Sequence, residues 1–372
     1  MILHPRPSPI AASMYQLRDI GIDAIILHGP SGCCFRTARL LEMDGVRVFT
    51  TAMDENDFIF GALEKLNNTI DEVINYLENN DPNKDKYIIG IVGTCASMII
   101  GEDIFSPIDD FKEKNGKEVV IIPVDIHSGL NDNTIGAIRT METCLDLLII
   151  DEQEFNRQKE MLEKATEIEK TRGMAKSKYI KPVYDDDLDK VMEILKNAKN
   201  LKIACVLNAK KETSYLFAHP LIEINKFNEK NKSNNKIINI ANLDQNIGLS
   251  KIKNDAKNLL KEYSNNNITI DYITGGLDEY PITGHKAMEI LKKIKPDIVV
   301  VSGAPHALFI EELKNINKDI ITIGISDGPR LYIPIKEVYD YGIIELDAHA
   351  KVLGKRNIVK SRMGEILNYV NK

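Results

Sequence analysis

Short apolar runs alternate with longer amphipathic stretches along most of the chain. The first runs lie at 22–29, 46–53, 87–94 and 117–126, and stretches with apolar residues about 3.6 positions apart lie between them. The run at 87–94 is apolar at odd and even positions alike, which is typical of a central strand of a parallel sheet. This alternation predicts an α/β fold with parallel sheets flanked by helices.

The same alternation returns in the second half, after a charged and mostly helical stretch at 152–200. We expect that stretch to connect two α/β blocks. Further strands are expected at 201–208, 236–244, 267–275, 297–304 and 319–326. The polar segment 226–237 is expected to be an exposed loop, and the last sixteen residues form an amphipathic helical pattern.

Composition narrows the class of protein. The chain has 372 residues, a formal net charge of -7, 43% hydrophobic and 28% charged residues, which is ordinary for a soluble globular protein. A net negative charge argues against a general nucleic-acid binder. The first residues lack the basic and apolar regions of a signal peptide, and no run of about 18 apolar residues occurs, so we expect a cytoplasmic protein.

Five cysteines remain to be explained, at positions 33, 34, 95, 144 and 205. An odd number in a chain of this length argues against a disulfide framework. Cys144 and Cys205 lie in apolar periodic segments, so we expect them in the core. For the other three the alternatives are a metal ligand, a nucleophile or a small buried hydrophobe.

Cys33, Cys34 and Cys95 follow predicted strands directly. Cys33 and Cys34 come after the turn Gly29–Gly32, and Cys95 follows a strand that ends at Thr94. Ligands bind at the carboxyl ends of strands in such sheets, and a helix start favours the thiolate form that ligates iron. Two thiolates per chain, from Cys33 and Cys95 with Cys34 as the alternative, make half of a [4Fe–4S] site. A homodimer would supply the other half.

Two segments resemble the nitrogenase component 1 family. The turn His28–Cys33 reads HGPSGC, similar to the HGPxGC turn of that family, and Cys95 followed by IGEDI at 100–104 is similar to its second cluster-ligand segment. The segments 4–13, 28–42 and 50–66 are most similar to the short, single-subunit type within the superfamily.

The resemblance implies three Rossmann-like domains. With the strand pattern it suggests a cluster-binding domain at 1–151, a helical connector at 152–200, a second α/β domain at 201–295 and a third at 296–372 with a C-terminal helix. It also implies a homodimer that shares one [4Fe–4S] cluster, and an ATP-hydrolysing iron protein partner similar to nitrogenase reductase. No GxxxxGK[ST] loop is present, so no ATP site is expected in this chain.

The activity implied is that of the electron-accepting, substrate-binding half of a two-component reductive cyclase. Such an enzyme reduces a nickel tetrapyrrole of the sirohydrochlorin type and closes a lactam ring on the route to the methanogen nickel coenzyme. Residues 1–10 contain no cysteine that corresponds to the first ligand of the larger nitrogenase cluster. A non-catalytic scaffold for metallocofactor assembly and a metal-free ligand-binding protein remain as alternatives.

Several other residues are candidates for contacts to such a substrate. The candidate catalytic residues are His28, His306 and Arg330, which lie at or just after the ends of predicted strands. His28 is equally compatible with a structural role at the strand edge. The candidate substrate-binding residues are Arg36, Arg39, His4, Arg6 and His285. The arginines are also typical of a solvated helix face, and His285 is expected near the start of a helix that could bind an anion.

Overall fold

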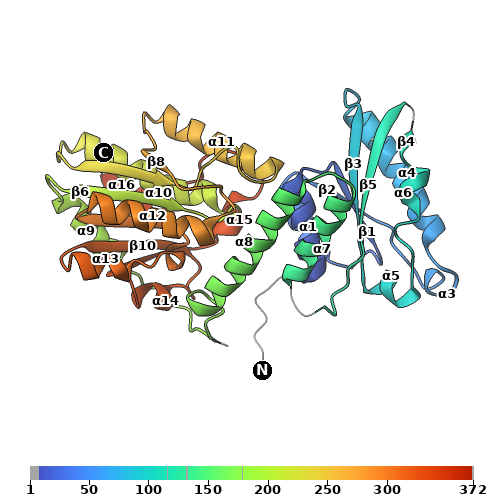
Figure 1. The fold of residues 1–372 in the computed structure, drawn as a ribbon, viewed down its shortest axis with the longest axis horizontal. Helices are drawn as coiled ribbons and strands as arrows, with labels where there is room; N and C mark the ends of the chain where they lie inside the picture. Colours follow the sequence, from blue (N-terminus) through green and yellow to red (C-terminus); the bar gives the residue numbers. More distant parts are fainter. Residues whose placement is uncertain (1–7, 115, 131–132, 178, 371–372) are drawn as a thin grey trace. The chain divides into compact units, whose positions relative to one another are not determined.

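The computed structural model describes residues 8–114, 116–130, 133–177 and 179–370. The chain forms two compact units, which Figure 1 shows as a ribbon coloured along the sequence. Of the described residues, the N-terminal unit comprises those up to 159 together with 249–251, and the C-terminal unit comprises 160–248 together with those from 252 onward. Among the described residues, every helix is too short or too polar to cross a lipid bilayer.

The N-terminal unit contains a five-stranded sheet in the order β2-β1-β3-β5-β4. All neighbouring strands are parallel except the short pair of β4 and β5. The strands are β1 Ala24–His28, β2 Arg47–Thr50, β3 Lys86–Gly93, β4 Glu113–Lys114 and β5 Lys117–Val124. The helices are α1 Pro9–Ile20, α2 Phe35–Met43, α3 Asp57–Phe60, α4 Leu63–Asn80, α5 Cys95–Ile100, α6 Pro107–Asp110 and α7 Asn133–Asp146.

The central strand β3 is covered on both faces, as its apolar sequence predicts. Ile89 and Ile91 join a buried cluster with the apolar side of α4. Gly90, between them, faces the opposite side, where a Cβ atom would lie 2.6 Å from Leu17 Cδ1 of α1. Because successive residues of a strand point to opposite faces, the two helices sandwich the sheet.

The C-terminal unit contains a six-stranded parallel sheet in the order β11-β10-β9-β6-β7-β8. The strands are β6 Lys202–Asn208, β7 Lys236–Ala241, β8 Tyr272–Ile273, β9 Ile298–Gly303, β10 Ile321–Asp327 and β11 Tyr341–Glu345. Helix α8, Glu152–Thr171, begins in the N-terminal unit and ends in this one. The other helices are α9 Leu188–Asn197, α10 Ser214–Lys230, α11 Ser250–Asn265, α12 Tyr280–Ile294, η1 Pro305–Ala307, α13 Glu311–Ile316, α14 Tyr332–Lys336, α15 Ala348–Val352 and α16 Arg362–Val370.

Parallel sheets flanked by helices are therefore confirmed, but the expected division into three α/β domains differs from the structure. The expected boundary at 295/296 falls inside one sheet, because β9 lies between β6 and β10 and pairs with both. The described residues hold two sheets in place of three. Strands from 201–295 and from 296–372 contribute to one buried hydrophobic cluster, so the two ranges form a single α/β unit.

Two further elements differ from the pattern in the sequence. The long helix expected over 57–79 is interrupted at Gly61, whose φ of 86° lies outside the helical range, so α3 ends there and α4 starts at Leu63. The polar segment expected as a loop at 226–237 is helical as far as Lys230.

A close approach of two loops joins β1 to β3 at their carboxyl ends. Thr94, directly after β3, donates a hydrogen bond from Oγ1 to the carbonyl oxygen of His28 at 2.9 Å. A Cβ atom on Gly29 would lie 2.5 Å from this Oγ1 atom, closer than atoms can pack. Glycine at position 29 is therefore required for the contact between the two loops that carry Cys33 and Cys95.

We predict that Gly29→Ala lowers the free energy of unfolding by about 1–3 kcal/mol, because the added methyl group displaces Thr94 and weakens its hydrogen bond. Gly32→Ala is the matched control, since a Cβ atom there meets nothing within 4 Å. Denaturation followed by circular dichroism measures both. Equal stability of the two variants would contradict this account of Gly29.

Candidate functional site

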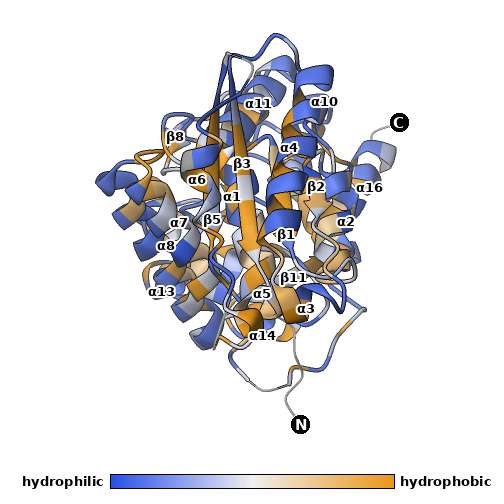
Figure 2. Ribbon diagram, turned by 90° about the vertical axis from the view of Figure 1, so that its right-hand side faces the viewer, coloured by the Kyte–Doolittle hydropathy of each residue, from blue (hydrophilic) through white to orange (hydrophobic). Residues whose placement is uncertain are grey.

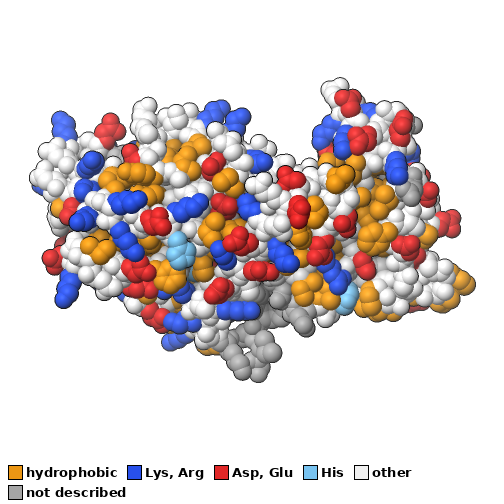
Figure 3. Space-filling view, in the orientation of Figure 1, with side chains coloured by type: hydrophobic (Ala, Val, Ile, Leu, Met, Phe, Trp, Pro, Cys, Tyr) orange, Lys and Arg blue, Asp and Glu red, His pale blue; other side chains and the backbone are white. Residues whose placement is uncertain are grey.

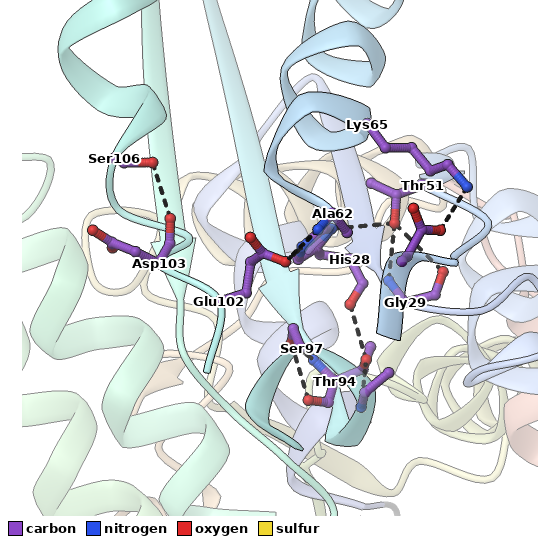
Figure 4. Close-up of polar contacts among 12 residues, drawn as sticks. His28, Gly29, Thr51, Ala62, Lys65, Thr94, Ser97, Glu102, Asp103 and Ser106 are labelled. Carbon is purple, nitrogen blue, oxygen red and sulfur yellow. Dashed lines mark hydrogen bonds and ion pairs between the residues drawn. The ribbon is translucent and has the colours of Figure 1, made fainter. Parts of the chain in front are cut away.

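The candidate site lies at the carboxyl edge of the N-terminal sheet, where β1 and β3 end side by side (Figure 4). Thr94 caps α5: its Oγ1 accepts a hydrogen bond from Ala96 N, and Ser97 Oγ accepts one from Thr94 N at 2.8 Å. This capping box fixes the first residue of α5, which is Cys95. The sequence T-C-A-S thus sets the position of Cys95 relative to β3.

The other cysteines come from the loop between β1 and α2. Cys33 closes a turn by donating its N–H to the carbonyl oxygen of Pro30 at 2.9 Å. Cys34 has a φ of 52°, in the left-handed region, and α2 begins only after it, at Phe35. Non-glycine residues adopt this conformation at a cost in free energy, which is often found at functional sites.

The three thiols influence one another. The thiols of Cys33 and Cys34 form a hydrogen bond, which lowers the pKa of Cys34 to about 7, against the opposing effect of burial. The same hydrogen bond, together with burial, raises the pKa of Cys33. Cys95 is near enough for its charge to act on Cys34. The adjacent thiols thus share one proton, and Cys34 loses its proton more easily than Cys33. The cause is the hydrogen bond between the two thiols, whereas the sequence had suggested the dipole of the helix.

Cys95 is half-buried, and its Sγ accepts a hydrogen bond from Ser128 N at 3.3 Å. Cys33 and Cys34 are half-buried as well, and all five cysteines are free thiols. Cys144 and Cys205 are buried, as their apolar contexts predict, and burial raises the pKa of each to about 12. The thiols that remain available to a ligand are therefore those at the strand edge.

The donor set at this edge fits an iron–sulfur cluster in part. Thiolates are the ligands of such clusters, and three thiols lie here at the surface. In the described part of the chain, however, no three His, Cys, Asp or Glu side chains are arranged to hold a metal ion. The residues on this edge that could hold a cluster are therefore Cys33, Cys34 and Cys95.

His28 lies beneath this edge and not within an open site. Its side chain is fully buried; Nδ1 is 3.2 Å from Thr51 Oγ1, and Nε2 is 3.8 Å from Glu102 Oε2, too far for a hydrogen bond. Burial lowers the pKa of His28, although Glu102 and Asp57 act in the opposite direction. Glu102 itself accepts a hydrogen bond from Ala62 N at 2.7 Å (Figure 4). This environment favours the structural role of His28 at the strand edge.

Exposed apolar side chains lie on α2 and α5, the helices that begin at or next to the cysteines, and on α3, which contacts α5. Phe35 of α2 is 67% exposed, Ile59 and Phe60 of α3 are 72% and 83% exposed, and Ile99 of α5 is 69% exposed. Met98 of α5 is exposed as well. Helices α3 and α5 are in contact, and Figure 2 shows them side by side in the colours of hydrophobic residues. We call these five residues the apolar face. A cluster of exposed apolar side chains marks an interaction surface more often than a solvated one.

The candidate substrate-binding residues are spread over both units. Arg36 and Arg39 are exposed on α2, and Arg39 pairs with Glu42 at 3.1 Å. His4 and Arg6 lie outside the described residues. His285 is exposed and lies in the second turn of α12, which begins at Tyr280. Its ring stacks on Phe309 with centroids 5.1 Å apart.

The C-terminal unit brings His306 to the carboxyl edge of its sheet. His306 follows β9 and is 1% exposed, with Nε2 3.1 Å from Glu169 Oε1. The same oxygen accepts a hydrogen bond from Lys210 Nζ at 2.5 Å. Arg330 is half-buried in the turn after β10. The sequence analysis did not identify Lys210, although its position just after the strand at 201–208 could have indicated a site residue. It did not identify Glu169 either.

Lys210 and Glu169 form an ion pair in which each side chain is largely buried. Burial disfavours both charges and is the largest single effect, but Lys210 and His306 together lower the pKa of Glu169 below its usual range. Tyr280, Glu169 and Asp327 likewise raise the pKa of Lys210. Each charge is thus retained because its partner is present.

Curated relatives match nearly the whole chain. A protein from Methanocaldococcus jannaschii is 64% identical over 371 residues, 99% of each chain. Proteins from Methanothermobacter thermautotrophicus and Methanosarcina acetivorans are 50% and 40% identical, over 98% and 100% of this chain and 98% of each relative. All three are named "Ni-sirohydrochlorin a,c-diamide reductive cyclase complex, component CfbD".

Residues 8–200 match the family described as "Nitrogenase component 1 type Oxidoreductase", and this range includes Cys33, Cys34 and Cys95. The match covers more than half of the chain and agrees with the resemblance noted at the two cysteine segments. The chain therefore belongs to the nitrogenase component 1 type oxidoreductase family.

Proposed function

We propose that this chain is the electron-accepting, substrate-binding component of a two-component, ATP-dependent reductive cyclase. Its substrate would be Ni-sirohydrochlorin a,c-diamide, and its reaction the reduction of that macrocycle with closure of a lactam ring. The observation that carries the proposal is the 64% identity, over 99% of both chains, to a relative named for this complex. The names of the relatives favour this function over a scaffold for cofactor assembly.

Cys33 and Cys95 are the proposed cluster ligands, with Cys34 as the alternative for Cys33. Two copies of the chain would contribute two thiolates each to one [4Fe–4S] cluster at a twofold axis. When bound, the cluster supplies one-electron transfer. The lowered pKa of Cys34 and its hydrogen bond to Cys33 keep the adjacent pair partly deprotonated at neutral pH, as thiolate ligation requires.

The apolar face supports a homodimer. Phe60, Ile59 and Ile99 lose contact with water if a second copy covers them, and this burial is the main source of affinity at obligate interfaces. Figure 3 shows hydrophobic side chains at the right-hand end of the molecule, where Figure 1 places α3. An interface around half-buried thiols also keeps water away from an electron carrier.

The remaining roles follow from the proposed reaction. The electron donor would be an ATP-hydrolysing iron protein similar to nitrogenase reductase, as the family resemblance implies. This protein, and not the present chain, would then bind the ATP. Arg36, Arg39 and His285 are exposed and would bind carboxylates of the macrocycle, while His306 and Arg330 would contact it or supply protons. We expect the complex in the cytoplasm.

The whole reaction provides the first test. Combined anaerobically with an ATP-hydrolysing iron protein, ATP and Ni-sirohydrochlorin a,c-diamide, the chain is expected to convert the macrocycle. Loss of ring double bonds shortens the conjugated system, so absorbance spectroscopy follows the change. Omission of ATP or of the iron protein should stop it. A spectrum that stays constant in the complete mixture, with substrate bound, contradicts catalysis and favours the scaffold.

The cysteine assignment predicts a loss of bound metal. After anaerobic reconstitution, Cys33→Ser and Cys95→Ser are each expected to lose most of their iron and sulfide and the electron paramagnetic resonance signal of the reduced cluster, because serine is a poor ligand for it. Cys144→Ala, which removes a buried core thiol, is the matched control and should retain both.

Cys34→Ser decides between the adjacent cysteines. Retention of cluster by Cys34→Ser and its loss in Cys33→Ser assign the ligand to Cys33, and the reverse result assigns it to Cys34. A full signal in the double variant Cys33→Ser/Cys95→Ser would overturn the site.

The apolar face predicts the oligomeric state. Phe60→Glu and Ile99→Glu are expected to convert the dimer into monomers, because a charge buried in an apolar interface costs more than the contact gains. Light scattering coupled to size-exclusion chromatography measures the mass. Leu148→Glu is the control, since Leu148 is equally exposed but lies beyond the end of α7. Dimers that persist in both interface variants place the contact elsewhere.

A further inference from the structure

The strand order of the C-terminal sheet defines one position at which a ligand site is expected. The chain runs outward from β6 through β7 to β8, and then returns to the other side of β6 with β9, followed by β10 and β11. Strand order therefore reverses between β6 and β9. In open parallel sheets, ligands bind outside the carboxyl ends of the strands at this reversal, because the flanking loops diverge there.

The two loops that leave β6 and β9 are held firmly at this position. Ala304 donates its N–H to the carbonyl oxygen of Asn208 at 2.8 Å. Asn208 Oδ1 accepts a hydrogen bond from Thr283 Oγ1 at 2.6 Å. A Cβ atom on Gly303, whose φ is 113°, would lie 2.6 Å from Ala209 Cα. Only glycine permits this approach, so the loops carrying Lys210 and His306 start from a fixed base.

Lys210 and His306 converge here on a single oxygen atom. Glu169 Oε1 accepts hydrogen bonds from Lys210 Nζ at 2.5 Å and from His306 Nε2 at 3.1 Å. Glu169 belongs to α8 and not to the sheet, and its carboxylate fills the place where two donors of the sheet meet. Two nitrogen donors directed at one carboxylate oxygen, one of them an ammonium group, are typical of a carboxylate-binding site.

The second nitrogen of His306 lacks a partner. Because a carboxylate only accepts hydrogen bonds, Nε2 carries the proton toward Glu169, and Nδ1 is left for another group. Nδ1 is fully buried and has no hydrogen-bond partner among the described residues. Unsatisfied buried polar atoms are rare because they cost free energy. A ligand with a further polar group beside its carboxylate could form the missing hydrogen bond with Nδ1 of His306.

We propose that Lys210 and His306 form a carboxylate-binding site at the strand reversal of the C-terminal sheet, where Glu169 stands in for a peripheral carboxylate of the tetrapyrrole. The assignment of the ligand to a tetrapyrrole rests on the proposed function. A ligand carboxylate displaces that of Glu169, so that Lys210 keeps an anionic partner throughout. The side chain of Glu169 then turns toward water, which it already reaches with 16% of its surface.

The exchange selects for charge. A neutral ester or amide in the place of Glu169 would leave the largely buried side chain of Lys210 without the carboxylate that it contacts directly, which is unfavourable although Asp327 also acts on this charge. A carboxylate removes that cost. Each ligand carboxylate must also displace Glu169. Its binding is therefore weakened by the free energy of the ion pair between Glu169 and Lys210. The site is therefore specific for anions and moderate in affinity.

Binding to the full-length chain tests the proposal without catalysis. Ni-sirohydrochlorin a,c-diamide and uroporphyrin, a second tetrapyrrole with several carboxylates, are titrated and followed by absorbance. Glu169→Gln removes the competing charge, so affinity for both is expected to rise several-fold. Lys210→Met removes the cation, so affinity is expected to fall by roughly tenfold. If the single variants fold poorly, the double variant Glu169→Gln/Lys210→Met, which carries neither charge of the pair, takes their place. It should bind both compounds with the reduced affinity expected of Lys210→Met.

The matched controls are Glu312→Gln and Lys292→Met, which break an ion pair of the same 2.5 Å length in the same unit. Both should bind like the unaltered chain. The methyl ester of uroporphyrin should bind all variants alike, since it offers no carboxylate. Equal affinities of the Glu169 and Lys210 variants for both carboxylated probes would falsify the proposal, as would a loss of affinity in Glu169→Gln and Lys210→Met alike.

The two proposals fail separately in this design. Uroporphyrin binding that depends on Lys210, combined with no binding or turnover of Ni-sirohydrochlorin a,c-diamide, overturns the proposed function and supports the carboxylate site. Turnover of the nickel compound with affinities independent of Lys210 and Glu169 supports the function and overturns the site.

Discussion

The parallel alignment of neighbouring strands is the constraint from which both candidate sites arise. Parallel strands place all their carboxyl ends at one edge, so residues far apart in the sequence meet there. Cys33 and Cys95 are 62 positions apart, yet the hydrogen bond from Thr94 to the carbonyl oxygen of His28 joins the loops that carry them. The pairing of β6 with β9 brings Lys210 and His306 together in the same way.

The two edges offer opposite chemistry. At the N-terminal edge, polarizable thiols lie among exposed apolar side chains such as Phe35, a setting that suits a soft metal cluster covered by another apolar surface. At the C-terminal edge, largely buried charges neutralise one another, and the proposed site there would favour a small anionic group over a neutral one. The proposed cluster ligands and the proposed carboxylate site therefore each lie at the carboxyl edge of a parallel sheet, one in each unit.

The strands and their parallel pairing could be predicted because apolar runs and helical periodicity are local properties of the sequence. The domain boundary could not, because a strand that extends an existing sheet and a strand that starts a new one have the same pattern. One of the two partners of β9 is β6, almost a hundred residues earlier, and no local signal records that pairing. The break at Gly61 was likewise hidden, since glycine tolerates a helical as well as a left-handed conformation.

The cysteine site could be located because each thiol follows a strand and a turn within a few residues. Glu169 could not, because it lies in a charged helical stretch whose pattern is typical of a solvated face. Periodicity indicates which side of a helix is apolar. It does not indicate which cation a charged residue of that helix will contact in the folded chain. The distances of 2.5 Å and 3.1 Å from one Glu169 oxygen to Lys210 and His306 depend on tertiary structure alone. A partly buried charged residue such as Glu169, which lies on a helix near the carboxyl edge of a sheet, therefore indicates a site only when the residues that contact it are known.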